Sequence, residues 1–356
     1  MLYSIQLMKK PIEYYQNHLN KVSRSFAACI AQLPQPLRRY VSLTYLVCRV
    51  LDSVEDARWK RFSEQLNAFK LFNGLLDDPK MVKRLDLISV PIPDGLTPEE
   101  EELIKDAKSL FEDLHESPVP VKQSIQSLVK SMSNGMRYFA EQRQSGGLRL
   151  AGLQEVNQYC FFVAGLVGET LASLLAAVDP RVGFNKELVL KAHHFGLFLQ
   201  KVNLLKDQFR DEKEGRFLVP SRMNVYASLE QNADAAWSYI QSIPVEQKGY
   251  RVFCLWSFFL GLKTLPLLKN QSSVEMEPKL AREETLALFK LLESKAQNLE
   301  ELQELFDECV KAAEFDQVRG DLTEQDKQAT SLWFEKYYSG MLTQKEFAQL
   351  GMVPTV

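Results

Sequence analysis

Residues 196–211, GLFLQKVNLLKDQFRD, carry the pattern that decides the fold class. Apolar residues fill most of this stretch, while the polar positions recur at steps of four, three, four and four, the spacing of one helix face. That stripe consists of Gly196, Gln200, Asn203, Asp207 and Asp211. Gln200 and Asn203 would be costly to bury among apolar neighbours without partners. The stripe therefore indicates a wet, functional cavity rather than a solvated surface.

Residues 45–56, YLVCRVLDSVED, have a similar arrangement. Steps of four, three and four place Tyr45, Arg49, Asp52 and Asp56 on one narrow helix stripe. Carboxylates one turn apart repel each other, and a divalent cation would relieve that repulsion. In isolation the motif fits the acidic end of a solvated helix equally well, because short motifs recur by chance. Two such helices in one chain favour carboxylate pairs that face each other.

Hard carboxylate oxygens favour Mg²⁺, which keeps several waters and bridges to phosphate oxygens. The residues predicted to bind the metal are Asp52, Glu55, Asp56, Asp207 and Asp211. The adjacent His193 and His194 point about a quarter-turn apart on a helix and cannot chelate an ion together. We expect these two histidines to be packing or surface residues.

A phosphate-bearing ligand would also need cations, and four basic residues lie in or near the motifs: Arg24, Arg49, Lys206 and Arg216. Each alone fits an ordinary surface charge, and their recurrence beside acidic motifs makes them candidates. The sequence has no P-loop or Rossmann glycine motif, which excludes phosphate binding by those loops.

Composition sets the class of protein. The 356 residues are 46% hydrophobic and 25% charged, as in a globular protein with a sizeable core. A net charge of −3 argues against a nucleic-acid binder. The five cysteines are scattered and lack C-x-x-C spacing, which argues against a disulfide framework or a zinc site. The N-terminus shows no signal-peptide pattern.

Helical periodicity dominates, and no segment alternates convincingly as a strand would. Thr97, Pro98 and Glu100 stand in the order of a helix start with a capping box. The apolar stretches 159–178 and 252–268 are expected to be buried core helices, because charged residues interrupt both. We expect one all-α domain over residues 1–356, with about 315–356 packed as a C-terminal helical appendage.

The motifs resemble those of the squalene/phytoene synthase family over most of the chain, from about Tyr14 to about Arg282. Four ordered segments carry the likeness: 22–28, 45–56, 159–168 and 196–220. Within the family, the third segment and the FLQKVN run are most similar to squalene synthases. The resemblance implies the isoprenoid synthase fold, a single helical bundle around a central cavity.

The resemblance also implies a Mg²⁺-dependent prenyltransferase that joins two farnesyl diphosphates through presqualene diphosphate and reduces the product to squalene with NADPH. Tyr159 would act with the four aspartates, assisting diphosphate departure and proton transfer. Substrate would be bound by Ser23, Arg24, Ser25, Phe26, Tyr45, Arg49, Gln200, Asn203, Lys206, Arg216 and Phe253. Phe26 and Phe253 match aromatic positions near the carbocation, where ring faces stabilise charge, although composition alone would place both in the core.

The same resemblance makes Lys279 and Arg282 the candidates for binding NADPH, although a solvated basic patch fits them equally well. The alternatives within the fold are a non-reducing dehydrosqualene, phytoene or hydroxysqualene synthase. A non-catalytic assembly subunit and a membrane-embedded protein are the alternatives of other classes. We expect a cytoplasmic protein without a transmembrane anchor, with peripheral membrane contact for product release.

Overall fold

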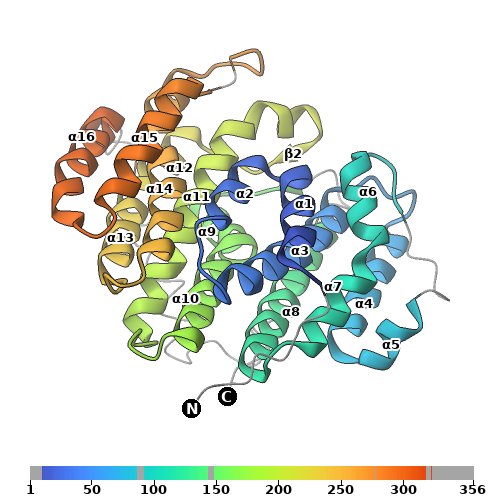
Figure 1. Ribbon diagram of the computed structural model, residues 1–356. Coiled ribbons are helices and arrows are strands. Elements are labelled where there is room, and N and C mark those ends of the chain that lie inside the picture. The colour runs from blue at the N-terminus through green and yellow to red at the C-terminus, as the bar shows by residue number, and fades with distance from the viewer. Residues whose placement is uncertain (1–9, 86–91, 143–147, 277, 318–321, 323–356) are drawn as a thin grey trace.

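Helices build nearly all of the computed structural model, which describes residues 10–85, 92–142, 148–276, 278–317 and 322 (Figure 1). The N-terminal helices are α1 Ile12–Val22, α2 Arg24–Ile30, α3 Leu37–Asp56, α4 Phe62–Asp77, α5 Pro79–Lys83, α6 Pro98–Lys105, α7 Ala107–Glu116 and α8 Val119–Gln142. The later helices are α9 Leu153–Cys160, α10 Leu166–Val178, α11 Lys186–Lys213, α12 Arg222–Ala227, α13 Leu229–Ser242, α14 Lys248–Asn270, α15 Arg282–Lys295 and α16 Gln303–Ala313. The expected all-α class is confirmed.

Helix α11 runs through the middle of the bundle and packs against α10, α13 and α14 (Figure 1). It contains the stretch 196–211, and the apolar residues there turn away from the polar stripe: Leu197, Phe198 and Leu205 are fully buried. Opposite α11, helix α3 packs against α1, α7 and α8. The two predicted aspartate helices therefore both belong to the bundle interior.

Helices α10 and α11 cross unusually closely, because glycines face backbone at the crossing. A Cβ on Gly168 would lie 2.1 Å from the Ala192 carbonyl oxygen, and one on Gly196 would lie 2.2 Å from the Ala164 carbonyl oxygen. Such distances leave no room for any side chain. Gly196 therefore has a packing role in addition to its place on the polar stripe.

Helices α9 and α10 are joined by a π-helical turn, Phe161–Gly165, into one long helix over Leu153–Val178. Among the described residues, this helix and α14 are long and apolar enough to cross a membrane. The most apolar windows are 56% and 67% buried inside the protein, which fits the predicted core helices. Glu169, the charge within the first of them, pairs with the buried His193 at 3.1 Å.

The structure also contains a short parallel pair of strands that the sequence did not predict, β1 Leu148–Arg149 and β2 Arg216–Phe217. Two residues are too few to show a strand period. The predicted helix start at Thr97 is confirmed, with both halves of the capping box formed.

The buried side chains form one contiguous core from Tyr15 to Phe315. The five cysteines are all buried free thiols. Except for residues 315–317 and Leu322, the predicted appendage at 315–356 lies outside the described residues.

Candidate active site

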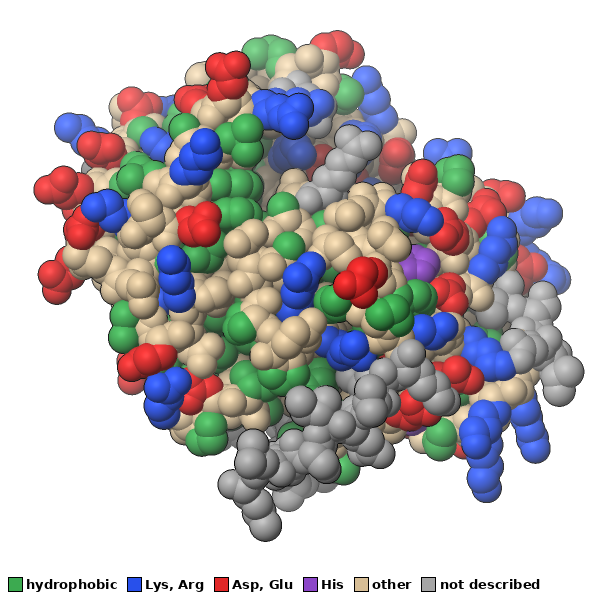
Figure 2. Space-filling model, viewed as in Figure 1, with side chains coloured by type: hydrophobic (Ala, Val, Ile, Leu, Met, Phe, Trp, Pro, Cys, Tyr) green, Lys and Arg blue, Asp and Glu red, His purple; other side chains and the backbone are tan. Residues whose placement is uncertain are grey.

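A cavity of about 500 Å³ opens between α3 and α11, and α2, α8, α9, α10 and α14 complete its walls. All five residues of the α11 stripe line it, and so do Tyr45, Arg49, Asp52 and Asp56 of α3. In the space-filling view the molecule is hollowed between the α14 side and α2, with hydrophobic side chains along one wall (Figure 2). The helical spacings therefore predicted the two faces that meet at this cavity.

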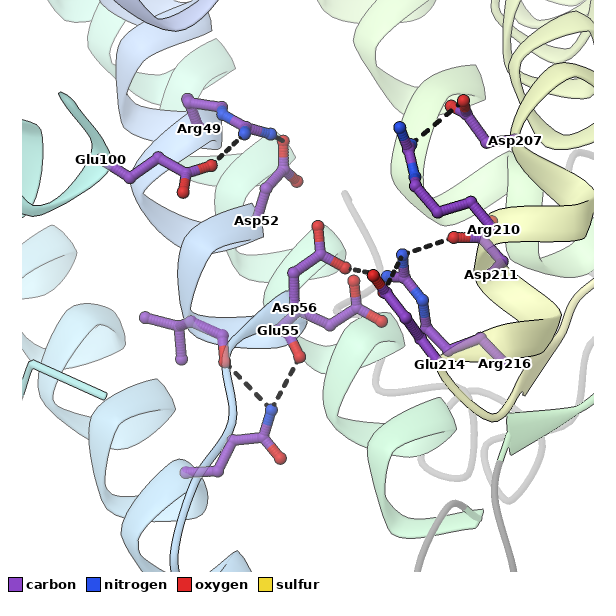
Figure 3. A network of polar contacts seen from close by, with 12 residues as sticks. Arg49, Asp52, Glu55, Asp56, Glu100, Asp207, Arg210, Asp211, Glu214 and Arg216 are labelled. Carbon is purple, nitrogen blue, oxygen red and sulfur yellow. Dashed lines mark hydrogen bonds and ion pairs between the residues drawn. The ribbon is translucent and has the colours of Figure 1, made fainter. Parts of the chain in front are cut away.

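At the α3 side of the cavity mouth, Arg49 lies between two carboxylates (Figure 3). Its Nη1 lies 3.9 Å from Asp52 Oδ2, and its Nη2 forms a hydrogen-bonded ion pair with Glu100 Oε1 of α6. Burial raises the pKa of Asp52 to about 7; Arg49 opposes this shift, and the neighbouring charge of Asp56 adds to it. A nearby cation would restore the ionised form of Asp52.

On the α11 side, Arg216 bridges the two carboxylate pairs (Figure 3). Its Nη2 donates to Asp211 Oδ1 at 2.6 Å, and its Nη1 donates to Asp56 Oδ1. Burial alone would lower the pKa of Arg216, but Asp56 and Asp211 raise it instead. The guanidinium therefore stays charged and holds the two helices' acidic ends together. Asp207 is paired separately, with Arg210 at 3.0 Å.

The turn after α11 explains how Arg216 reaches the mouth. Gly215 has a φ of +79°, and its N–H donates to the Glu212 carbonyl oxygen at 3.1 Å. A glycine adopts this left-handed conformation without the steric cost of a Cβ, which makes it the preferred residue just past a helix end. The chain then turns back into β2, whose first residue is Arg216.

Arg49 and Arg216 each have one buried N–H group without an acceptor in the described part of the chain. In both side chains this group is the Nε–H. A buried N–H without an acceptor costs free energy. Two such donors at one cavity mouth suit an anionic ligand with several acceptor oxygens.

The residues at this mouth fit Mg²⁺. The four aspartates offer only hard oxygen ligands, and the Arg216 ion pairs engage the Oδ1 atoms of Asp56 and Asp211 rather than their Oδ2 atoms. In the described ranges, no group of three or more His, Cys, Asp or Glu side chains forms a ready-made cage. Mg²⁺ needs no such cage, because it commonly binds through one or two carboxylates together with waters and substrate phosphates.

Tyr159 lines the cavity from the end of α9 and is 5% exposed. Its ring packs edge-on against Phe139, with centroids 5.3 Å apart. Burial raises the pKa of Tyr159 well above its ordinary value, and the negative charges of Glu55 and Asp56 raise it further. The phenol therefore keeps its proton and is available as a hydrogen-bond donor.

The inner part of the cavity is apolar. Phe26 of α2 and Phe253 of α14 both line it, and the Phe26 ring lies 5.7 Å from the Tyr45 ring, centroid to centroid. Two hydroxyls in the wall are bonded back to their own helices: Thr44 Oγ1 donates to the Tyr40 carbonyl oxygen at 2.7 Å, and Ser257 Oγ to the Phe253 carbonyl oxygen at 3.0 Å.

Several predicted residues do not line the cavity. Ser25 is exposed, and Lys206 of α11 is not among the lining residues. Ser23 lies between α1 and α2, where its side chain forms a hydrogen bond with the lining residue Tyr45. Lys279 and Arg282 are exposed and also lie outside the lining. The side chain of Arg24 is outside the described residues.

Glu100 was not predicted as a site residue, because its sequence context indicated only a capping box. Arg210, which pairs with Asp207, was not predicted either. Its spacing of three residues from Asp207 in the last turn of α11 is the signal that could have indicated this ion pair. The Glu100–Arg49 ion pair joins residues that are 51 positions apart in the sequence, and no local pattern predicts such a contact.

Comparison with known sequences gives a consistent picture. The sequence model of the squalene/phytoene synthase family matches residues 19–246. The squalene synthase of Mycosarcoma maydis is 31% identical over 231 residues, covering 64% of this chain and 38% of the relative. The squalene synthase of Bos taurus is 29% identical over 208 residues, covering 57% and 45%. The matched part thus spans less than half of these curated relatives.

Comparison with solved structures supports the fold. A structure of TcSQS in complex with a ligand superposes with a TM-score of 0.67 at 22% identity, covering 91% of this chain and 98% of the other. A dehydrosqualene synthase in complex with a ligand gives a TM-score of 0.55 at 18% identity, covering 80% and 95%. At these identities the likeness establishes a shared helical architecture.

Proposed function

The chain belongs to the squalene/phytoene synthase family, and we propose that it condenses two farnesyl diphosphates head to head and reduces the product to squalene. The observation that carries the proposal is the pairing of two aspartate-bearing helices across the mouth of one apolar cavity. A polar mouth suits the diphosphates, and an apolar interior suits the prenyl chains.

Asp52 and Asp56 of α3, with Glu55 beside them, and Asp207 and Asp211 of α11 would hold Mg²⁺ in this proposal. When bound, the metal neutralises the diphosphate leaving group as it departs. The Nε–H groups of Arg49 and Arg216, unpaired among the described residues, would donate to phosphate oxygens. Hydrogen bonds between charged groups of this kind are stronger than those between neutral groups. Gln200 and Asn203, on the same stripe of α11, would contact the substrate between the mouth and the apolar interior.

Ionisation of one farnesyl diphosphate leaves an allylic cation and free diphosphate. The double bond of the second molecule attacks this cation, and loss of a proton closes the cyclopropane of presqualene diphosphate. Because Tyr159 keeps its proton, its first role is to donate a hydrogen bond to the departing diphosphate. The released diphosphate is a stronger base than the protonated Tyr159 phenol, so diphosphate would accept the proton that is lost.

In the second half-reaction presqualene diphosphate would ionise with loss of its diphosphate, and NADPH, when bound, would supply the hydride that converts the rearranged cation to squalene. Water must be kept from this cation. The rings of Phe26 and Phe253 serve this purpose because they stabilise positive charge without reacting as nucleophiles. The hydroxyl protons of Thr44 and Ser257 are engaged by backbone carbonyls, so neither group donates a hydrogen bond into the cavity.

Lys279 and Arg282 remain our candidates for contacting the NADPH phosphates, from the segment between α14 and α15. We further propose a cytoplasmic location with peripheral membrane contact, because squalene is insoluble in water and must pass into lipid.

The deciding experiment supplies farnesyl diphosphate and Mg²⁺ with and without NADPH and identifies the hydrocarbon. Squalene that appears only with NADPH supports the proposal. The same hydrocarbon in both reactions identifies a non-reducing synthase of this fold, and a hydroxylated product identifies a hydroxysqualene synthase. No turnover under any condition favours a non-catalytic subunit.

A further inference from the structure

Glu100 divides its carboxylate between two partners. Oε2 accepts the Thr97 backbone N–H at 2.9 Å and completes the capping box of α6. Oε1 forms the ion pair with Arg49 across the gap to α3. The Glu100 side chain is 15% exposed, which is low for a residue in the first turn of a helix. The same group that begins α6 therefore also reaches the cavity mouth.

The contact matters because of where it leaves Arg49. Arg49 and Asp52 are three residues apart on α3, an ordinary spacing for a close ion pair. Nevertheless Arg49 Nη1 stays 3.9 Å from Asp52, at the outer limit of such a pair. Glu100 holds the neighbouring nitrogen, so the guanidinium is drawn away from Asp52. Without that anchor, Arg49 would be free to close on Asp52 and occupy its oxygens.

We propose that Glu100 is a positioning residue that holds Arg49 away from Asp52, so that the Asp52 oxygens stay available to Mg²⁺ and the Arg49 Nε–H stays available to diphosphate. Glu100 itself contacts neither ligand. This inference rests on the proposed function only in the identity of the ligands, Mg²⁺ and a diphosphate. Helix α6 would then contribute to the site, because Glu100 at its N-terminus sets the position of the Arg49 guanidinium on α3.

The test variant is Glu100→Gln. An amide oxygen can still accept the Thr97 N–H, so the helix cap is preserved, while the charge opposite Arg49 is lost. Inorganic diphosphate is titrated calorimetrically at a series of free Mg²⁺ concentrations, and the Mg²⁺ concentration that gives half of the maximal diphosphate affinity is recorded. We expect this concentration to rise roughly three- to thirty-fold, the range of one charge-assisted contact at a partly exposed site.

Two matched controls separate positioning from stability. Thr97→Ala removes the other half of the capping box and keeps the Arg49 ion pair. Glu101→Gln makes the same chemical change one residue along, where the side chain pairs with the surface residue Lys105. Neither control should change the Mg²⁺ requirement. A similar rise in Thr97→Ala would overturn the proposal, because weakening α6 would then be sufficient.

A double-mutant cycle tests whether Glu100 acts through Arg49. In an Arg49→Gln background, Glu100→Gln should leave the Mg²⁺ requirement unchanged, since no guanidinium remains to close on Asp52. An equal rise in both backgrounds would overturn the proposal, as would an unchanged requirement in the single variant. Because the readout is binding of inorganic diphosphate, the expected result would stand even if farnesyl diphosphate gave no squalene.

Discussion

Replacing Arg216 with methionine would leave Asp56 and Asp211 facing each other without the guanidinium that lies between them. The Arg216 side chain is 15% exposed and that of Asp211 is 6% exposed, so this pair is largely desolvated. Removing one partner of a buried pair costs about 3–5 kcal/mol. Asp56 is 44% exposed and adds at most about 1 kcal/mol. We take about 3 kcal/mol as the expected loss of unfolding free energy.

That loss converts into a modest thermal shift. A chain of 356 residues has an unfolding entropy of roughly 0.75 kcal/mol per degree. The melting temperature should therefore fall by about 4 °C in the absence of divalent ions. Mg²⁺ at ten times its dissociation constant would raise the unfolding free energy of the variant by about 1.4 kcal/mol. This corresponds to a rise of about 2 °C in its melting temperature. In the native protein the gain from Mg²⁺ should be smaller, because Arg216 already neutralises Asp56 and Asp211.

Differential scanning fluorimetry with millimolar Mg²⁺ or with EDTA measures both effects. The matched control is Arg210→Met, which removes an arginine on α11 that is 60% exposed and pairs with Asp207. We expect the control to change stability by less than about 1 kcal/mol. An Arg216→Met melting temperature no lower than that of the control would contradict this prediction. So would an equal rise in melting temperature on adding Mg²⁺ to the variant and to the native protein.

Three further predictions concern activity. Asp52→Asn or Asp207→Asn should nearly abolish turnover of farnesyl diphosphate while circular dichroism stays native, because each removes a charge that would hold Mg²⁺; near-normal rates would end the metal assignment. Tyr159→Phe should lower the rate of the first ionisation with little change in diphosphate affinity, as measured by rapid quench and calorimetry; a fully active variant would make Tyr159 a core residue only. Replacing Lys279 and Arg282 together by alanine should preserve presqualene diphosphate formation and slow its reduction; an equal loss in both half-reactions would make them structural.

The periodicity of the sequence predicted the two faces that meet at the cavity. On a helix, steps of three and four residues fix which side chains share a face, so the α3 and α11 stripes could be derived before their partners were known. These features depend on neighbours within one helix.

Features that depend on distant parts of the chain were not predictable in this way. The Glu100–Arg49 pair joins two helices that are 51 positions apart, and its only local signal was the capping box. Arg216 reaches Asp56 across 160 positions, by way of the Gly215 turn and a two-residue strand. Lys206 is not among the lining residues, although Asn203 and Arg210, one turn before and after it on α11, both line the cavity.

We propose that this cavity joins two farnesyl diphosphates with the help of Mg²⁺. The most direct test incubates the protein with farnesyl diphosphate and Mg²⁺ in the absence of NADPH, and quantifies both inorganic diphosphate and the prenyl product. We expect Mg²⁺-dependent release of one diphosphate for every two farnesyl diphosphates consumed, with presqualene diphosphate as the product of a quenched reaction. Farnesol with one diphosphate per substrate, or turnover that is indifferent to Mg²⁺, would contradict it.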